Sequence, residues 1–206
     1  MLGFGPDAIF RIPALLIALT VHEFAHARVA VTLGDPTPRV AGRDTLNPIP
    51  HLDPIGLLML WLAGFGWAKP VPINPYNLRN GRNGVIMVSL AGVAANFFTA
   101  LIAAIVWGIL AKMHLATFEV NWIFREIIYF NLILVVFNLI PLPPLDGSQV
   151  VSALLPGRQA YSYERIAPYG PFILMALVLT GIIGRIMNPF IDMLYNIINL
   201  FIRLIF

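Results

Sequence analysis

The stretch TVHEFAH, residues 20–26, lies inside an apolar run that starts at Ile12. It contains His-Glu-x-x-His, a spacing that places His22 and His26 one helical turn apart on the same face. Both imidazoles can therefore reach one metal ion, while Glu23 lies beside the metal, in the place of a general base. In a soluble protein the pattern is typical of a zinc hydrolase. Here the flanking residues are apolar enough to lie in lipid, so the stretch predicts a metal-binding helix inside a membrane.

The composition of the chain indicates an integral membrane protein. Its 206 residues are 59% hydrophobic and 11% charged, whereas charged residues make up about 25% of a typical soluble domain. A membrane span needs about 20 mainly apolar residues, which leaves room for about five or six spans and little else. We therefore expect a single domain over residues 1–206. The chain has no cysteine, which excludes disulfides and thiolate zinc ligands.

Apolar runs and their breaks predict the architecture. The expected spans are residues 8–33, 83–111, 127–145, 166–184 and 188–206. The uncharged run 54–68 is too short to span comfortably and is expected to be re-entrant. Segments 37–48 and 67–75 are rich in proline and short polar residues, which favours a hairpin or short extended strands. The predicted fold is an all-α polytopic membrane protein with about five transmembrane helices, one re-entrant element and short membrane-associated β-hairpin strands.

The two histidines require a third ligand, because catalytic zinc usually has three protein ligands. Without cysteine this ligand must be His, Asp or Glu, and the candidates at membrane depth are Asp146, Asp192, His51 and Asp53. Asp146 is the best of them, because prolines unwind the end of the helix 127–145 just before it. Irregular backbone at membrane depth must line a cavity or be buried in protein, and a carboxylate there is costly unless paired or bound to metal. Alternatively, Asp146 ends a helix at the water interface.

The distribution of positive charge gives an independent estimate of depth. Six basic residues flank the segment 35–84, namely Arg28, Arg39, Arg43, Lys69, Arg79 and Arg82. If 54–68 is re-entrant, all six lie on one side, as the positive-inside bias prefers. Asp146 then ends on the same side as the half of the first helix that carries His22 and His26. We expect a multi-pass protein of the cell membrane with its site toward the cytoplasmic side.

Two motifs together resemble the site-2 protease family of intramembrane zinc metalloproteases, peptidase family M50. They are HEFAH at residues 22–26 and Leu-Asp-Gly at residues 145–147, which follows a proline-rich turn. The likeness covers nearly the whole chain, and segments 42–56 and 66–75 resemble the compact members without PDZ or CBS domains. Residues 91–96, AGVAAN, resemble the family's Gly-Pro-x-x-Asn helix, with Val93 where the family usually has proline.

The resemblance implies one Zn²⁺ per chain, held by His22, His26 and Asp146. It implies that Glu23 is the general base, which takes a proton from the attacking water and later passes one to the leaving amine. The metal core would occupy about residues 8–147, followed by a C-terminal loop and two helices over 148–206.

Three further polar residues receive roles from the resemblance. Asn96 would donate a hydrogen bond to the oxyanion of the substrate, and the alternative is an interhelical hydrogen bond. His51 would hydrogen-bond near the site or the substrate, and the alternative is a polar residue at the tip of a hairpin. Asn138 would orient the Asp146 loop or line the substrate path.

The extended segments would offer edges to an unwound substrate strand.

The expected function is that of a zinc-dependent intramembrane endopeptidase, which cleaves transmembrane segments of membrane proteins. One alternative is a membrane-embedded zinc hydrolase of signal-peptide remnants or lipid-soluble amides. The other is a catalytically silent membrane adaptor, which would not need Glu23. The expected partners are a transmembrane protein or peptide substrate and the lipid bilayer, with no nucleic acid. The sequence leaves open whether the chain forms a homo-oligomer.

Overall fold

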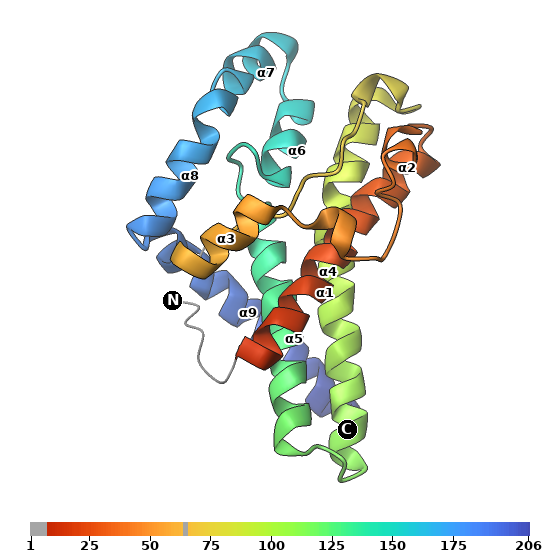
Figure 1. Ribbon diagram of the computed structural model, residues 1–206, viewed down its shortest axis with the longest axis vertical. Coiled ribbons are helices and arrows are strands. Elements are labelled where there is room, and N and C mark those ends of the chain that lie inside the picture. Colours follow the sequence, from red (N-terminus) through yellow and green to blue (C-terminus); the bar gives the residue numbers. More distant parts are fainter. Residues whose placement is uncertain (1–7, 64–65) are drawn as a thin grey trace.

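The computed structural model describes residues 8–63 and 66–206, and this part of the chain is mainly helical, with longer connections on either side of residues 54–63 (Figure 1). The α-helices are α1 (Ala8–Thr32), α2 (Thr37–Val40), α3 (Pro54–Ala63), α4 (Gly81–Lys112), α5 (Phe118–Asn138), α6 (Asp146–Leu154), α7 (Gly157–Glu164), α8 (Gly170–Leu179) and α9 (Ile182–Ile205). Three single 3₁₀ turns connect them, namely η1 (Ile49–His51), η2 (Pro75–Asn77) and η3 (Ala167–Tyr169).

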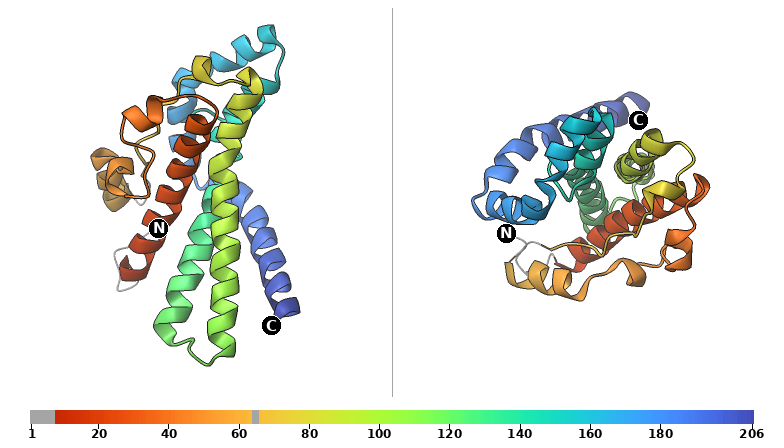
Figure 2. Two further views of the ribbon diagram at one scale, coloured as in Figure 1. Left: turned by 90° about the vertical axis from the view of Figure 1, so that its right-hand side faces the viewer. Right: turned by 90° about the horizontal axis from the view of Figure 1, so that it is seen from above.

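Helices α1, α4 and α5 form the centre of the structure. Figure 2 shows α4 and α5 running side by side, and α1 packs against both of them. Small residues make these contacts close, since Ala14 and Ala18 of α1 and Ala100 of α4 have no exposed surface. Such residues let helix backbones approach one another, which is how helices associate in membranes. The small-residue face of α1 is also the face that carries the two histidines.

The number of spanning helices is lower than the sequence predicts. Within residues 8–63 and 66–206, three helices are long and apolar enough to cross a membrane, Phe10–Thr32, Gly81–Lys112 and Phe118–Asn138. A fourth span results if the bent pair 157–179 and 182–205 is counted as one. The expectation of about five was wrong for the C-terminal part. The expected span 166–184 is interrupted, because Gly181 takes a left-handed conformation (φ 72°) and the chain bends by 79° there. Glycine adopts this conformation at no steric cost.

The predicted β-hairpin strands were also wrong. Within the described residues the only β pairing is a single antiparallel bridge between Leu52 and Ala68. Residues 37–40 form the short helix α2, with Pro38 in its first turn, where proline is well tolerated. Segment 66–74 runs extended, but its prolines lack the N–H groups that a strand ladder needs. The expected re-entrant run 54–68 contains α3, and residues 64–65 lie outside the described part.

Asp35 anchors the extended segment 66–74 to the end of α1. Its side chain is fully buried and accepts hydrogen bonds from the backbone N–H and the hydroxyl of Thr37, at 3.1 and 2.6 Å. It also accepts from the backbone N–H of Asn74 at 2.7 Å and from the side-chain amide of Asn77 at 3.0 Å. Four donors on one carboxylate satisfy its charge, so Asp35 fixes where the segment passes over α1.

We expect Asp35→Asn to lower the free energy of unfolding by about 1–3 kcal/mol, because an amide cannot accept all four hydrogen bonds. Burial alone would raise the pKa of Asp35, but the hydrogen bonds from Thr37, Asn77 and Asn74 lower it below the ordinary 3.8. A depressed pKa in the folded state stabilises the protein above the ordinary pKa. The difference between wild type and variant is therefore complete above about pH 4 and disappears as the pH falls through the lowered pKa.

The measurement is denaturant unfolding in detergent micelles between pH 3 and pH 7, followed by tryptophan fluorescence. The matched control is Asp53→Asn. Asp53 accepts from the backbone N–H groups of Ile55 and Gly56 at the start of α3, a position where asparagine serves as well as aspartate. A difference between wild type and Asp35→Asn that does not change with pH would contradict this account of Asp35.

Candidate metal centre

Helix α1 and the start of α6 bring three metal-ligating side chains together. The Nε2 atoms of His22 and His26 are 3.0 Å apart, and Oδ2 of Asp146 lies 3.2 and 3.3 Å from them. Both histidines are buried and Asp146 is half-buried. These are the three residues that the resemblance assigns to zinc. Among the described residues they form the one group of three such side chains whose ligand atoms lie within 4.8 Å of one another.

Asp146 reaches this position because the chain turns sharply between α5 and α6. Helix α5 ends at Asn138, and Asp146 is the first residue of α6, where the N-terminal end of the helix favours a negative charge. Gly147 makes the turn compact, since a Cβ atom there would lie 2.4 Å from the carbonyl oxygen of Leu139. The irregular break that the sequence predicts just before Asp146 is therefore present.

The ligand atoms fit a zinc ion. Nδ1 of His22 lies 2.6 Å from Oδ1 of Asn96, and Nδ1 of His26 lies 2.8 Å from the carbonyl oxygen of Val88. Both partners are acceptors, so each Nδ1 carries the hydrogen and each Nε2 presents its lone pair. The buried Oδ2 of Asp146 has no hydrogen-bond partner. Two nitrogen lone pairs and a carboxylate oxygen that face one another repel each other unless a cation lies between them. Two histidines and one carboxylate are a ligand set that zinc binds in proteins.

The separations agree with this assignment. Two ligand atoms about 2.0–2.1 Å from zinc at a tetrahedral angle lie about 3.3 Å apart, and the three observed separations are 3.0, 3.2 and 3.3 Å.

Gly92 of α4 forms the wall against which the two histidine rings lie. A Cβ atom at this position would be 2.6 Å from both Cε1 of His22 and Nε2 of His26, and 2.7 Å from Nδ1 of His22. Real Cβ atoms do not approach other atoms this closely, so only glycine leaves room for both rings. The sequence places Gly92 on a face of small residues, but the spacing within α4 does not reveal which residues of α1 it meets.

Glu23 lies beside the cluster and is held by the extended segment. One carboxylate oxygen accepts from the backbone N–H of Val71 at 3.2 Å. Pro70 and Pro72 flank Val71 and have no N–H, so Val71 is the one backbone donor in these three residues. The buried Arg43 donates to the carbonyl oxygen of Lys69, and its positive charge acts on the Glu23 carboxylate. From the sequence alone, Arg43 counts only among the basic residues and Val71 only within the segment 66–75. Neither is assigned a contact near Glu23, because such contacts depend on how the chain folds.

Asn96 is fully buried behind His22. Its oxygen accepts from His22, while its NH₂ group donates to the carbonyl oxygen of Ala18 at 2.9 Å and to Oδ1 of Asn131 at 2.8 Å. Both amide hydrogens are thus engaged within the protein. The oxyanion contact expected of Asn96 would require one of them to be released.

The other residues singled out in the sequence lie outside the cluster. His51 is buried, and its Nε2 donates to the carbonyl oxygen of Thr45 at 2.9 Å. The amide of Asn138 donates to Leu134 of its own helix at 3.1 Å. Their roles near substrate stay predictions. Asp192 is exposed on α9, and Asp53 caps α3, so neither contributes a ligand atom to the cluster.

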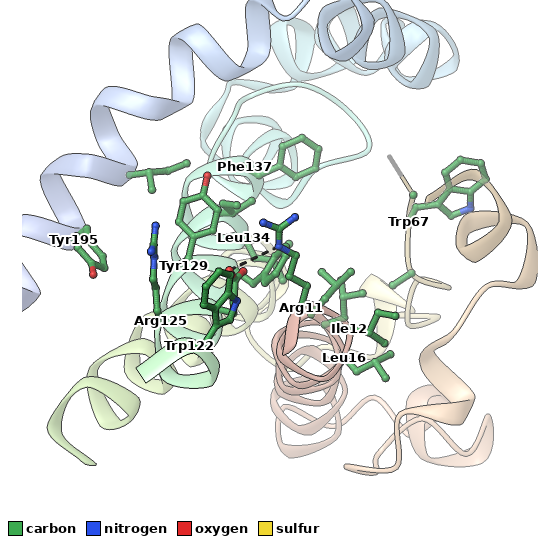
Figure 3. Close-up of a pocket in the computed structure, with 18 of the residues that line it drawn as sticks. Arg11, Ile12, Leu16, Trp67, Trp122, Arg125, Tyr129, Leu134, Phe137 and Tyr195 are labelled. Carbon is green, nitrogen blue, oxygen red and sulfur yellow. Dashed lines mark ion pairs between the residues drawn. The ribbon is translucent and has the colours of Figure 1, made fainter. Parts of the chain in front are cut away.

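A large cavity of about 1270 Å³ opens beside α1, between this helix, α5 and α9 (Figure 3). Its walls are mainly apolar and aromatic, and Figure 3 shows Trp122, Tyr129 and Phe137 of α5 on one side. An ion pair between Arg11 and Glu126, 3.7 Å apart, crosses from α1 to α5 within it. The cavity is large enough for several side chains of a peptide and lies along the helix that carries the histidines.

Comparison with known proteins adds independent information. Residues 108–181 match the family described as peptidase family M50. The chain is 36% identical over 191 residues to the "Putative zinc metalloprotease YwhC" of Bacillus subtilis, which covers 89% of this chain and 86% of that protein. It is 29% identical over 205 residues to the "Putative zinc metalloprotease Rip2" of Mycobacterium tuberculosis, covering 97% and 76% of the two chains. The protein of the same name from Mycolicibacterium smegmatis is 31% identical over 186 residues, covering 86% and 69%. No solved structure matches the chain significantly.

Proposed function

Because this chain belongs to peptidase family M50, the site-2 protease family of zinc metalloproteases, we propose that it cleaves protein substrates within the membrane. Membership of the family identifies the chain as a metalloprotease and zinc as its metal. The finer proposal is an endopeptidase that acts on transmembrane segments. It uses one zinc ion held by His22, His26 and Asp146.

The meeting of these three side chains carries the proposal. They come from helices that are distant in the sequence, they are buried or half-buried, and their ligand atoms face a common point. Helix α1, which supplies two of them, is long and apolar enough to span a membrane. A hydrolytic centre on such a helix meets its substrate among apolar segments. The cavity beside α1 is lined by the half of the helix before His22, and none of the four site residues lines it.

The residues of the chain divide the chemistry between them. When bound, zinc polarises the scissile carbonyl and makes water acidic enough to lose a proton near neutral pH. Glu23, next to His22 in α1, takes that proton and passes one to the leaving amine. The N–H of Val71 fixes one carboxylate oxygen of Glu23, which leaves the other oxygen to exchange protons. Arg43 holds the backbone of Lys69 and thereby the segment that carries Val71.

We expect Glu23→Gln to lower cleavage of a transmembrane test peptide by about 10²–10⁴-fold, because the amide cannot accept the proton. Zinc content should stay at one ion per chain, since Glu23 is not a ligand. The measurement is cleavage by purified protein in lipid vesicles, together with zinc quantified in the same samples.

The matched control is Glu119→Gln, at an exposed carboxylate near the start of α5, which should cleave like wild type. Equal cleavage by wild type and Glu23→Gln would contradict the proposed function, and so would a wild-type protein that binds no zinc. A wild-type protein that binds zinc but cleaves nothing would favour an adaptor.

A further inference from the structure

Two buried asparagines form a chain of hydrogen bonds behind His22. Asn131 of α5 donates to the carbonyl oxygen of Ile127 at 2.8 Å and accepts from Asn96 of α4 at 2.8 Å. Asn96 donates its other hydrogen to the carbonyl oxygen of Ala18 in α1 at 2.9 Å, and its own oxygen lies 2.6 Å from Nδ1 of His22. Both asparagines have no exposed surface. These hydrogen bonds thus link α5, α4 and α1, and they end at the imidazole ring of His22.

The directions of these hydrogen bonds follow from their fixed ends. A backbone carbonyl only accepts, so the NH₂ group of Asn131 must face Ile127, and its oxygen must face Asn96. The NH₂ group of Asn96 then has two acceptors, Asn131 and the carbonyl of Ala18. The oxygen of Asn96 is left facing His22, which must donate from Nδ1. Turning either amide over would bring two acceptors or two donors together in a buried place, at a cost of about 1–3 kcal/mol per unpaired group.

We propose that Asn96 and Asn131 are positioning residues that select the zinc-binding tautomer of His22. A neutral histidine carries its hydrogen on one ring nitrogen, and only the Nδ1–H form offers the Nε2 lone pair to the metal. Partners of this kind typically change metal affinity by about 10–100-fold. The inference rests on the proposed zinc centre. It gives Asn96 a task within the protein, distinct from the contact with substrate that the sequence suggests.

The two histidines differ in how they are controlled. His26 donates to the backbone carbonyl of Val88, which no substitution removes. His22 depends on a side chain, Asn96, and Asn96 in turn depends on Asn131. The tautomer of His22 can therefore be tested by mutation, while that of His26 serves as an internal reference.

The first measurement determines the tautomer of His22 in the zinc-free protein. It uses ¹⁵N NMR of the protein in detergent micelles, with its histidines labelled with ¹⁵N. The chain has four histidines, so His22→Gln assigns the signal. At a pH where the rings of both His22 and His26 are neutral, wild type should show the Nδ1–H form. Asn96→Leu and Asn131→Leu should show a mixture of the two forms for His22 and no change for His26.

The second measurement is zinc affinity by competition with a chelator. Asn96→Leu should bind zinc about 10–100-fold more weakly than wild type, and Asn131→Leu should show a smaller loss. Asn96→Asp keeps an acceptor for Nδ1–H and should bind zinc at least about tenfold more tightly than Asn96→Leu. The control is Thr99→Val, which removes a hydrogen bond from the hydroxyl to Ala95 in the same helix and should leave both readouts unchanged.

The outcomes separate this inference from the proposed function. A wild-type protein without zinc, or His22→Gln that binds zinc like wild type, would overturn the zinc centre itself. If zinc binding depends on His22, but Asn96→Leu keeps the Nδ1–H form and wild-type affinity, only the role of the asparagines is overturned. Should Asn96→Leu fail to fold, Asn131→Leu decides alone, because it keeps Asn96 in place, and an unchanged tautomer there is the contrary result.

Discussion

Replacing Gly92 with alanine is expected to abolish zinc binding and peptide cleavage. The added Cβ would lie 2.6–2.7 Å from atoms of both histidine rings. The two rings cannot both move away from the added atom, because His22 is hydrogen-bonded to Asn96 and His26 is hydrogen-bonded to the carbonyl oxygen of Val88. Loss of an outer partner alone typically costs about 10–100-fold in metal affinity, so displacing two ligands should cost about 100-fold or more. Zinc content and cleavage of the test peptide by the purified variant measure the effect.

The control for this prediction is Gly184→Ala in α9. It is also a helical glycine, and a Cβ there meets nothing within 4 Å. The Gly184→Ala protein should bind zinc and cleave the peptide like wild type. Its free energy of unfolding should rise by up to about 1 kcal/mol, because alanine has a higher helix propensity than glycine. A Gly92→Ala protein with normal zinc content would show that the close contact between α1 and α4 can relax.

Asp146→Asn should weaken zinc binding by about 100-fold or more and remove cleavage with it. The substitution removes the one negative charge among the three ligand atoms, and the donor set then no longer offsets a divalent cation. The fold should survive, because asparagine is tolerated at the start of a helix. Chelator competition measures the affinity, and thermal unfolding of the zinc-free protein checks the fold.

Asp44→Asn provides the comparison for the loss of a carboxylate. Asp44 pairs with the exposed side chains of Arg28 and Arg39 at 3.3 and 3.2 Å, and pairs at exposed sites contribute little. This variant should bind zinc like wild type. Near-normal zinc stoichiometry in Asp146→Asn would mean that the third ligand is another residue.

Sequence reasoning predicted well those features that depend on local spacing. The first helix was expected at 8–33 and is Ala8–Thr32, and the span expected at 83–111 is Gly81–Lys112. The i, i+4 spacing of His22 and His26 fixes their common face without any knowledge of the rest of the fold. Asp146 was singled out because an apolar helix broken by prolines leaves few places for a carboxylate. The structure places it beside the histidines, and its role as a ligand stays a prediction. The family and the metalloprotease assignment are confirmed by the relatives.

The errors arose where the outcome depends on partners that are distant in the sequence. Segment 66–74 is extended, as its prolines require, but a strand also needs a neighbour with free donors, and the described residues supply only one bridge. The run 166–184 is apolar enough to span, yet composition does not say that Gly181 turns the chain. The fit of Gly92 against the histidines depends on the register of α1 against α4, which neither helix specifies alone.

The length of α4 determines how deep the metal centre lies. Gly92, which touches both histidines, is the twelfth of 32 residues. At about 1.5 Å per residue it is about 17 Å from the Gly81 end of the helix and about 30 Å from Lys112. The longer distance alone equals the thickness of the hydrocarbon layer, about 30 Å. If Lys112 lies at one boundary of that layer, the centre therefore lies near the opposite boundary. A centre at that boundary has a short path to the water that hydrolysis consumes.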